Sequence, residues 1–213
     1  MVVNNNAFSE QLDSFVKEYP NFQKKTDSDH FYLKGILDIP DDEGIVAGSF
    51  SVEIHPTSDF PYEFPLLYEV GGEIPCEADW HKYSDGSCCL TVPAKERLIC
   101  KNGITLDWFV QNMAIPYFAN QLYKKQKGKY LQEYSHGDKG IWEFYAELFH
   151  SRDYNVWLRC LENSFGRSKY DRNGKCYCNS GKKYKKCHLQ IENDVRSIGK
   201  EQIVIDLKNM KLI

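Results

Sequence analysis

The sequence lacks a long apolar segment. No run approaches the roughly 18 to 20 consecutive apolar residues that a membrane-spanning helix requires. Residues 1–6 also lack the basic start and the apolar centre of a secretory signal peptide. We therefore expect a cytoplasmic protein without a membrane span.

The sequence also lacks both common glycine-rich phosphate-binding motifs. Neither Gly-x-Gly-x-x-Gly nor Gly-x-x-x-x-Gly-Lys-(Ser/Thr) occurs in it, and these are the loops that cradle the phosphates of nucleotides. We therefore expect no nucleotide-binding activating domain in this chain. Internal repeats and low-complexity tracts are absent as well.

What the chain does contain is enough apolar material for a core and an unusual grouping of thiols. With 213 residues, 42% hydrophobic, it can form one domain of ordinary size plus a small appendage. Among its eight cysteines, Cys88 and Cys89 are adjacent, and Cys176, Cys178 and Cys187 lie close together. Without a secretion signal, such clusters indicate metal binding or catalysis rather than disulfides.

Hydrophobic spacing predicts a helix, then three strands, then further helices. Apolar residues three and four apart predict a helix over residues 7–19, ended by Pro20. The predicted strands are 31–39, 45–54 and 66–70. After a long irregular segment, the predicted helices are 105–123, 141–149 and 156–161. This order is typical of an α+β fold, in which the helices are segregated from the sheet.

Three short segments occur in an order that carries a family resemblance. They are Ser-Phe-Ser-Val-Glu-Ile-His-Pro at 49–56, Phe-Pro-Tyr-Glu-Phe-Pro at 60–65, and Trp-His-Lys-Tyr-Ser-Asp-Gly-Ser-Cys-Cys-Leu at 80–90. Together with the amphipathic stretch 105–123, they resemble the ubiquitin-conjugating enzyme family. The resemblance covers about three-quarters of the chain and implies a UBC-like fold: an N-terminal helix, an antiparallel meander sheet, an active-site loop and C-terminal helices.

The resemblance also implies a nucleophile. The family has Gly-x-(Ile/Val)-Cys-Leu around its catalytic cysteine, and here Gly86, Cys89 and Leu90 match that pattern. A thiol suits an acyl carrier because its thiolate is a strong nucleophile and the thioester stays reactive toward amines. The implied function is that Cys89 accepts a protein C-terminus as a thioester and passes it to an amine. No cofactor is needed for that transfer.

One position departs from the family. No His-Pro-Asn tripeptide occurs, and His81 stands where the family carries the Asn thought to stabilise the oxyanion. Histidine can also donate a hydrogen bond to a developing negative charge. Tyr83 and Asp85 are candidates to orient the incoming amine or take its proton. His81, Tyr83, Asp85 and Cys89 are thus the predicted catalytic residues.

The amino-acid sequence of this loop is similar to that of bacterial family members. Some of these are encoded in antiphage CBASS operons beside a cyclic-oligonucleotide synthase (CD-NTase). By this resemblance, the protein substrate is such a synthase. Either a separate activating enzyme supplies the acyl group, or the chain works without one.

Structural roles are alternatives for each of these residues. The two cysteines can be core side chains, although neighbours in an extended segment face opposite ways, so Cys88 is expected to point inward and Cys89 outward. Asp85 followed by glycine is a common turn pair. Tyr83 can be a core aromatic and His81 a packed structural histidine. The pair of Cys89 and His81 is also compatible with a Cys-His hydrolase, but no third residue that would orient the histidine is recognisable by a motif.

A second motif lies near the C-terminus. Cys176, Cys178, Cys187 and His188 provide three sulfurs and an imidazole, which is one tetrahedral zinc set. The sequence Cys-x-Cys-x-Ser-Gly-x-x-Tyr-Lys-x-Cys-His matches the SEC-C motif at every fixed position. This motif is best known at the end of the protein-translocation ATPase SecA. We predict one structural zinc ion. The alternative is a flexible basic tail with unligated cysteines.

The predicted zinc-binding segment 176–188, here called the zinc knuckle, lies in a strongly basic stretch, although the whole chain has a net charge of −3. Residues 167–186 contain eight lysines and arginines against one acid, Asp171. Such a patch suits an acidic protein surface, a phosphate backbone or a lipid headgroup, or is merely solvated. The SEC-C resemblance favours protein docking, and we regard nucleic acid as the less favoured partner.

The predicted organisation is a conjugating domain, a linker, the knuckle and a tail containing a short strand at 201–207. These segments are 1–163, 164–175, 176–188 and 189–213. Two further functions remain open beside the conjugating enzyme. One is a catalytically silent UBC-like module that docks a partner through the knuckle, favoured by the missing Asn. The other is a nucleic-acid-associated protein that uses the knuckle alone.

Overall fold

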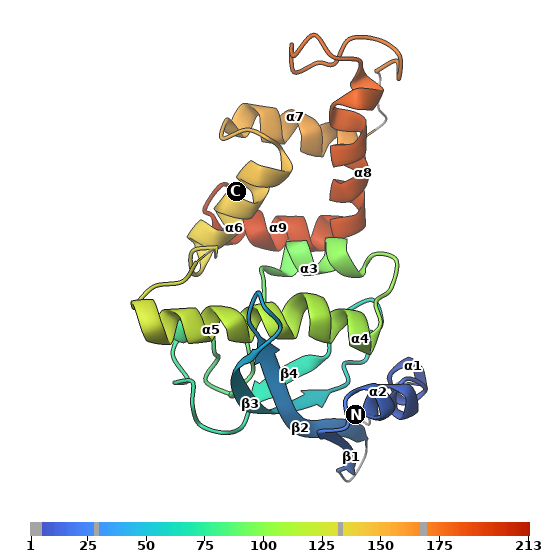
Figure 1. Cartoon of the computed structure of the whole chain (residues 1–213). Helices are drawn as coiled ribbons and strands as arrows, with labels where there is room; N and C mark the ends of the chain where they lie inside the picture. The colour runs from blue at the N-terminus through green and yellow to red at the C-terminus, as the bar shows by residue number, and fades with distance from the viewer. Residues whose placement is uncertain (1–5, 28–29, 132–133, 167–169) are drawn as a thin grey trace. The chain divides into compact units, whose positions relative to one another are not determined.

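The chain forms two compact units in this computed structural model (Figure 1), which describes residues 6–27, 30–131, 134–166 and 170–213. The first, here called the sheet unit, consists of Met1–Thr91 and Ile99–Glu133. The second, here called the helical unit, consists of Val92–Leu98 and Tyr134–Ile213. None of the described helices combines the length and the apolar character of a membrane-spanning segment.

The sheet unit is built on one antiparallel sheet with strand order β1-β2-β3-β4 (Figure 1). The strands are β1 (Phe22–Thr26), β2 (Phe31–Pro40), β3 (Val46–His55) and β4 (Leu66–Glu69). Alternate residues of β3 are buried, namely Phe50, Val52 and Ile54, so one face of the sheet packs against the core. The register pairs Leu37 with Phe50 and Leu33 with Ile54, which keeps apolar side chains on that face.

The helices of this unit lie at both ends of its sequence. They are α1 (Asn6–Ser9), α2 (Leu12–Glu18), α4 (Leu106–Phe109), the π-helical turn η2 (Val110–Ala114) and α5 (Ile115–Lys127). Thr105 caps α4, since its Oγ1 accepts the Trp108 N–H at 3.1 Å. Phe118 of α5 stacks on Phe50 of β3 with ring centroids 4.5 Å apart. This contact fixes α5 on the buried face of the sheet.

The helical unit packs around a buried aromatic cluster. Its helices are α6 (Asp138–Leu148), α7 (Tyr154–Phe165), α8 (His188–Ile198), α9 (Lys200–Asn209) and residues 93–98 of α3 (Pro93–Cys100). Trp157 lies 5.5 Å from Phe149 and 6.1 Å from Tyr145, measured between ring centroids. The Tyr145 hydroxyl donates to the Asp206 carboxylate at 2.8 Å, so α6 and α9 are joined by a buried polar contact.

The predicted α+β class is confirmed: a four-stranded antiparallel sheet is accompanied by helices. The three predicted strands correspond to β2, β3 and β4. Strand β1 was not predicted, because Phe22 is its only buried residue and the strand lacks the alternation of apolar residues that marks a strand. The irregular segment 71–103 contains α3, which was not predicted either.

The prediction of a strand at 201–207 is wrong, because this segment lies in helix α9. Its run of β-branched residues, Ile203-Val204-Ile205, is typical of strands. The buried side chains instead have helical spacing: Ile203 and Leu207 are buried, whereas Ile205 is 51% exposed.

The boundary between the units also differs from the prediction. We expected the first domain to reach residue 163, but residues 134–163 pack with the helical unit. The start of the predicted linker 164–175 belongs to α7, which ends at Phe165. Residues 167–169 of that linker lie outside the described part of the chain.

Candidate thiol site and metal centre

The Cys89 loop is a tight polar turn in the sheet unit. A 3-10 helix, η1 (Ala78–Trp80), ends at His81, which has a left-handed backbone with φ 48°. The chain then turns back so that the Cys89 N–H donates to the His81 carbonyl at 2.7 Å. Gly86 makes the reversal possible, because its φ of 88° strains any residue with a Cβ.

The two adjacent cysteines face opposite ways, as alternation along an extended segment predicts. Cys88 is only 8% exposed, and its N–H donates to the Leu67 carbonyl of β4 at 2.8 Å. Burial raises the pKa of the Cys88 thiol to about 12, so this thiol stays protonated at neutral pH. Cys89 is partly exposed. The accessible sulfur of the pair is therefore that of Cys89.

Tyr83 is the side chain that the structure brings to the Cys89 sulfur. Its hydroxyl donates to Cys89 Sγ at 3.1 Å, and 55% of the residue is exposed. It is thus a surface tyrosine rather than a core aromatic. A hydroxyl in this position favours a thiolate over a thiol, because it can donate to the negative charge.

Asp85 holds the turn together. Its carboxylate accepts the Ser87 N–H at 2.9 Å and the Ser87 hydroxyl at 2.7 Å. These two hydrogen bonds lower the pKa of the Asp85 carboxyl. The structure therefore places Asp85 in the turn that presents Cys89, which is the structural role weighed above.

The His81 ring packs edge-on against Tyr130, with ring centroids 5.1 Å apart. Its backbone carbonyl accepts the Tyr117 hydroxyl at 3.1 Å besides the Cys89 N–H. Sequence reasoning missed Tyr117 and Tyr130, because the first lies on a helix and the second follows it, far from the loop in sequence. The feature that points to them is Gln121, a polar residue on the buried face of α5. Its burial is known only from the structure.

Lys82, which is next to the site in sequence, has its ammonium bound at the end of β4. It is 5% exposed, and its ammonium lies 2.8 Å from a carboxylate oxygen of Glu69. The same ammonium donates to the carbonyls of Glu69 and Ile74 at 2.9 and 3.1 Å. Lys82 is therefore a buried anchor that ties the loop to the end of β4.

The four predicted metal ligands lie together in the helical unit. One ligand atom from each of Cys176, Cys178, Cys187 and His188 lies within 4.8 Å of every other. His188 Nδ1 is 3.3 Å from the sulfurs of both Cys176 and Cys187. Three thiolates and one imidazole are a donor set that zinc binds with tetrahedral geometry.

The His188 ring is buried next to the sulfurs of Cys176 and Cys187. Within the described residues, His188 Nε2 is buried and has no hydrogen-bond partner. A metal ion on Nδ1 fixes the tautomer that carries its proton on Nε2. The Tyr177 ring, whose centroid lies 4.8 Å from that of His188, covers the imidazole. Burial and the charge of His150 lower the pKa of His188, which favours the neutral imidazole that binds metals.

The knuckle is fastened to α8 by a buried carboxylate. Glu192 is 0% exposed and accepts hydrogen bonds from the hydroxyls of Tyr177, at 3.1 Å, and of Tyr184. Arg196 lies 3.5 Å from the same carboxylate and donates to the Ser164 carbonyl of α7. The fold of the knuckle is thereby linked to the packing of α7 against α8.

Residues 172–190 match the model of the SEC-C motif. The predicted motif is thus confirmed, and its three cysteines and one histidine are the residues that the structure brings together. No curated protein and no solved structure matches the chain. The SEC-C motif covers a short part of the helical unit and gives no information about the Cys89 loop.

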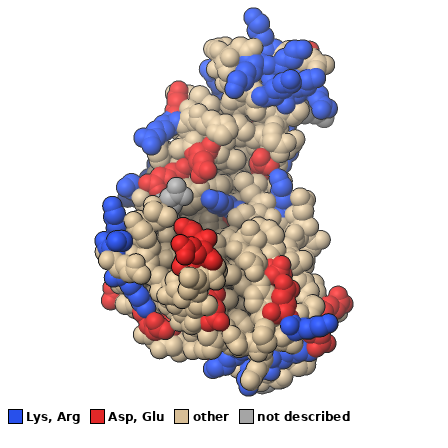
Figure 2. All heavy atoms as spheres, viewed as in Figure 1, with Lys and Arg blue, Asp and Glu red and all other residues tan. Residues whose placement is uncertain are grey.

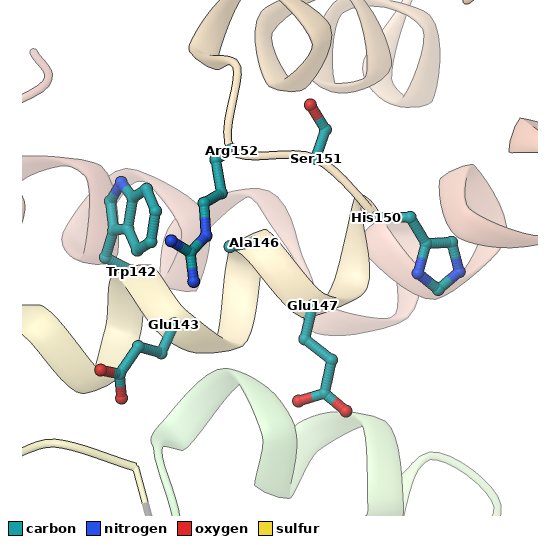
Figure 3. Close-up of a pocket in the computed structure, with 7 residues that line it drawn as sticks. All are labelled: Trp142, Glu143, Ala146, Glu147, His150, Ser151 and Arg152. Carbon is teal, nitrogen blue, oxygen red and sulfur yellow. The ribbon is translucent and has the colours of Figure 1, made fainter.

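A separate hollow of about 450 Å³ lies on α6 and the turn that follows it (Figure 3). The Arg152 guanidinium lies 5.5 Å from the centre of the Trp142 ring at this hollow. Both carboxylates at this hollow accept hydrogen bonds. Glu143 accepts one from the Ser135 N–H at 2.8 Å, and Glu147 accepts one from the Tyr134 hydroxyl. None of the predicted catalytic or metal-ligating residues lines it.

Proposed function

We propose that the sheet unit is a UBC-like domain and that Cys89 is an acyl carrier. In this proposal Cys89 forms a thioester with the C-terminus of a protein and transfers the acyl group to an amine. The observation that carries it is the pair of adjacent cysteines: Cys88 is sealed in the core, while Cys89 is accessible and accepts a hydrogen bond from Tyr83. The order of elements in the sheet unit, helices, a four-stranded meander and then helices, is in keeping with it.

The transfer has two balanced steps. In the first, the Cys89 thiolate attacks the activated carbonyl of the donor, a C–S bond forms, and the activating group leaves. In the second, a neutral amine attacks the thioester, a C–N bond forms, the nitrogen gives up one proton to solvent, the C–S bond breaks, and the thiolate leaves. Each step passes through an oxyanion, to which the His81 ring would donate a hydrogen bond. Tyr83 would donate to the sulfur where it is a thiolate, before the first step and after the second.

The proposed setting is the bacterial cytoplasm, where thiols stay reduced. There the acceptor would be a cyclic-oligonucleotide synthase of an antiphage CBASS system. The acyl donor would be activated by a separate enzyme, since no nucleotide-binding motif occurs in this chain.

We propose one structural zinc ion in the SEC-C motif, held by Cys176, Cys178, Cys187 and His188. Its ligands come from within 13 positions of the chain, 176 to 188. When bound, zinc would hold the knuckle closed, so that Tyr177 and Tyr184 reach the buried Glu192 carboxylate.

A second candidate function is a silent UBC-like module that docks an acidic partner through the knuckle. The observation that favours it is a group of exposed cations, gathered on the SEC-C segment in Figure 2. They are Arg172, Lys175, Lys182, Lys183, Lys185 and Lys186. Among the described residues none of them forms a salt bridge within the chain. Arg167 and Lys169, also in the predicted patch, lie outside the described residues.

The test is to express the protein with its genomic neighbours and to look for a covalent adduct that a thiol reagent removes. Cys89→Ala is expected to abolish the adduct, because it removes the attacking sulfur, while the matched variant Cys88→Ala retains it. Denaturing electrophoresis and mass spectrometry give the readout. Loss in Cys88→Ala with retention in Cys89→Ala would assign the chemistry to the other sulfur. Absence of any adduct would leave the docking function in its place.

A further inference from the structure

One face of helix α5 contacts three successive backbone carbonyls of the Cys89 loop. The Tyr117 hydroxyl donates to the carbonyls of His81 and Trp80 at 3.1 and 3.3 Å. The Gln121 amide donates to the Trp80 carbonyl at 3.1 Å, and the Lys124 ammonium donates to the Asp79 carbonyl. Spacings of four and three put these side chains on one helical face.

Gln121 is the unusual member of this face. It is 0% exposed, and a buried amide is costly unless its donors and acceptors are satisfied. Its amide nitrogen is satisfied by the Trp80 carbonyl, and its amide oxygen accepts the Tyr130 hydroxyl at 3.1 Å. Tyr130 lies beyond the end of α5, where Gly128 in a left-handed conformation turns the chain. Gln121 therefore joins the Cys89 loop to a segment that follows the helix.

Tyr130 in turn contacts the imidazole of His81. The two ring centroids are 5.1 Å apart and the rings are inclined by 65°. The Lys124 ammonium lies 4.4 Å from the centre of the Tyr130 ring and 4.5 Å from that of Trp80, so it is held between the two. The side chain of His81 is thus held by Tyr130, and its backbone by the hydrogen bonds of α5.

We infer that Gln121 and Tyr130 are positioning residues that set the orientation of the His81 imidazole in the Cys89 loop. A donor to an oxyanion works only when it is held in place before the charge develops. His81 has a left-handed backbone, which is strained for a residue with a Cβ and persists where its surroundings impose it. The inference deepens the proposed function, because it assigns to these residues the support of the His81 that acts on the thioester.

The test compares Tyr130→Phe and Gln121→Met with the matched control Tyr123→Phe. Tyr123 lies two positions after Gln121, so it faces another side of α5. Tyr130→Phe keeps the aromatic ring but removes the hydrogen bond from the Tyr130 hydroxyl to Gln121. Gln121→Met removes both hydrogen bonds of the side-chain amide and keeps a side chain of similar size. The first readout is the NMR signal of the His81 imidazole across a pH titration, which needs no acyl donor. We expect both variants to shift this signal and its titration midpoint, and the control to leave them unchanged.

The second readout is the rate at which the Cys89 thioester discharges to a free amine. We expect each variant to slow discharge by about tenfold, a fraction of the roughly 100- to 10,000-fold that a positioned proton-transferring group itself contributes. The double variant should be no slower than either single variant, because both substitutions break one chain of contacts. If Gln121→Met fails to fold, Tyr130→Phe decides on its own.

An His81 signal that stays unchanged in Tyr130→Phe would overturn the inference, as would effects on discharge that simply multiply in the double variant. A thioester that never forms in the unmodified protein would instead overturn the proposed function. The NMR titration would then still decide whether Gln121 and Tyr130 position His81.

Discussion

Cys187→Ala is expected to lower the zinc content of the purified protein from about one ion per chain to near zero. Three remaining ligands leave the tetrahedral set incomplete, and structural zinc sites in small domains contribute about 10–16 kcal/mol of apparent binding free energy. Without the ion, Tyr177 and Tyr184 lose their fixed positions over the buried carboxylate of Glu192. We therefore also expect faster amide hydrogen exchange in the first turns of α8.

The measurement is the metal content by atomic emission, together with hydrogen exchange followed by mass spectrometry. Cys76→Ala is the matched control, because Cys76 is an exposed cysteine outside the ligand cluster. It should retain the full zinc content. Zinc that persists after Cys187→Ala, or its absence from the unmodified protein, would contradict the ligand set.

Lys82→Met is expected to destabilise the sheet unit by about 3–5 kcal/mol, the usual cost of removing one partner of a buried ion pair. Glu69 is 3% exposed and would keep a buried charge without its ammonium. Burial by itself raises the pKa of Glu69, but Lys82 and the N–H groups of Glu73 and Ile74 outweigh it and lower that pKa below its usual 4.5. The stabilisation that Glu69 receives is accordingly present above about pH 4.5 and is lost as the pH falls through the lowered value.

Urea denaturation monitored at several pH values tests this expectation. The difference in unfolding free energy between the unmodified protein and Lys82→Met should be largest at neutral pH and should shrink in acid, as Glu69 is protonated in the variant. Glu69→Gln combined with Lys82→Met should recover most of the loss, because no buried charge remains. A Lys82→Met protein that unfolds at the same urea concentration at pH 7 would show that the pair does not stabilise the fold.

The features that were predicted correctly from sequence are those whose signal is local. The cysteines and the histidine of the SEC-C motif lie between positions 176 and 188, so their spacing alone indicated that they cluster. The opposite orientations of Cys88 and Cys89 follow from the geometry of an extended segment. The strands β2 and β3 were found because their buried and exposed residues alternate.

The features that were missed depend on partners far away in the chain. Helix α9 was taken for a strand because a short β-branched run does not reveal which of its residues a neighbouring helix will bury. Gln121 and Trp80 are 41 positions apart, and Tyr117 and His81 are 36 apart. No spacing rule links such residues, so the support of the Cys89 loop by α5 emerges only from the folded chain.

The central claim is that the thiol of Cys89 is the accessible and reactive one of an adjacent pair. Alkylation by iodoacetamide under native conditions at pH 8, resolved to single residues by fragmentation, measures this directly. With a pKa of about 12, only on the order of one Cys88 thiol in ten thousand is a thiolate at that pH, and its sulfur is also shielded by the core. Cys89 is therefore expected to be modified at least about 100-fold faster than Cys88. Equal rates, or faster modification of Cys88, would contradict it.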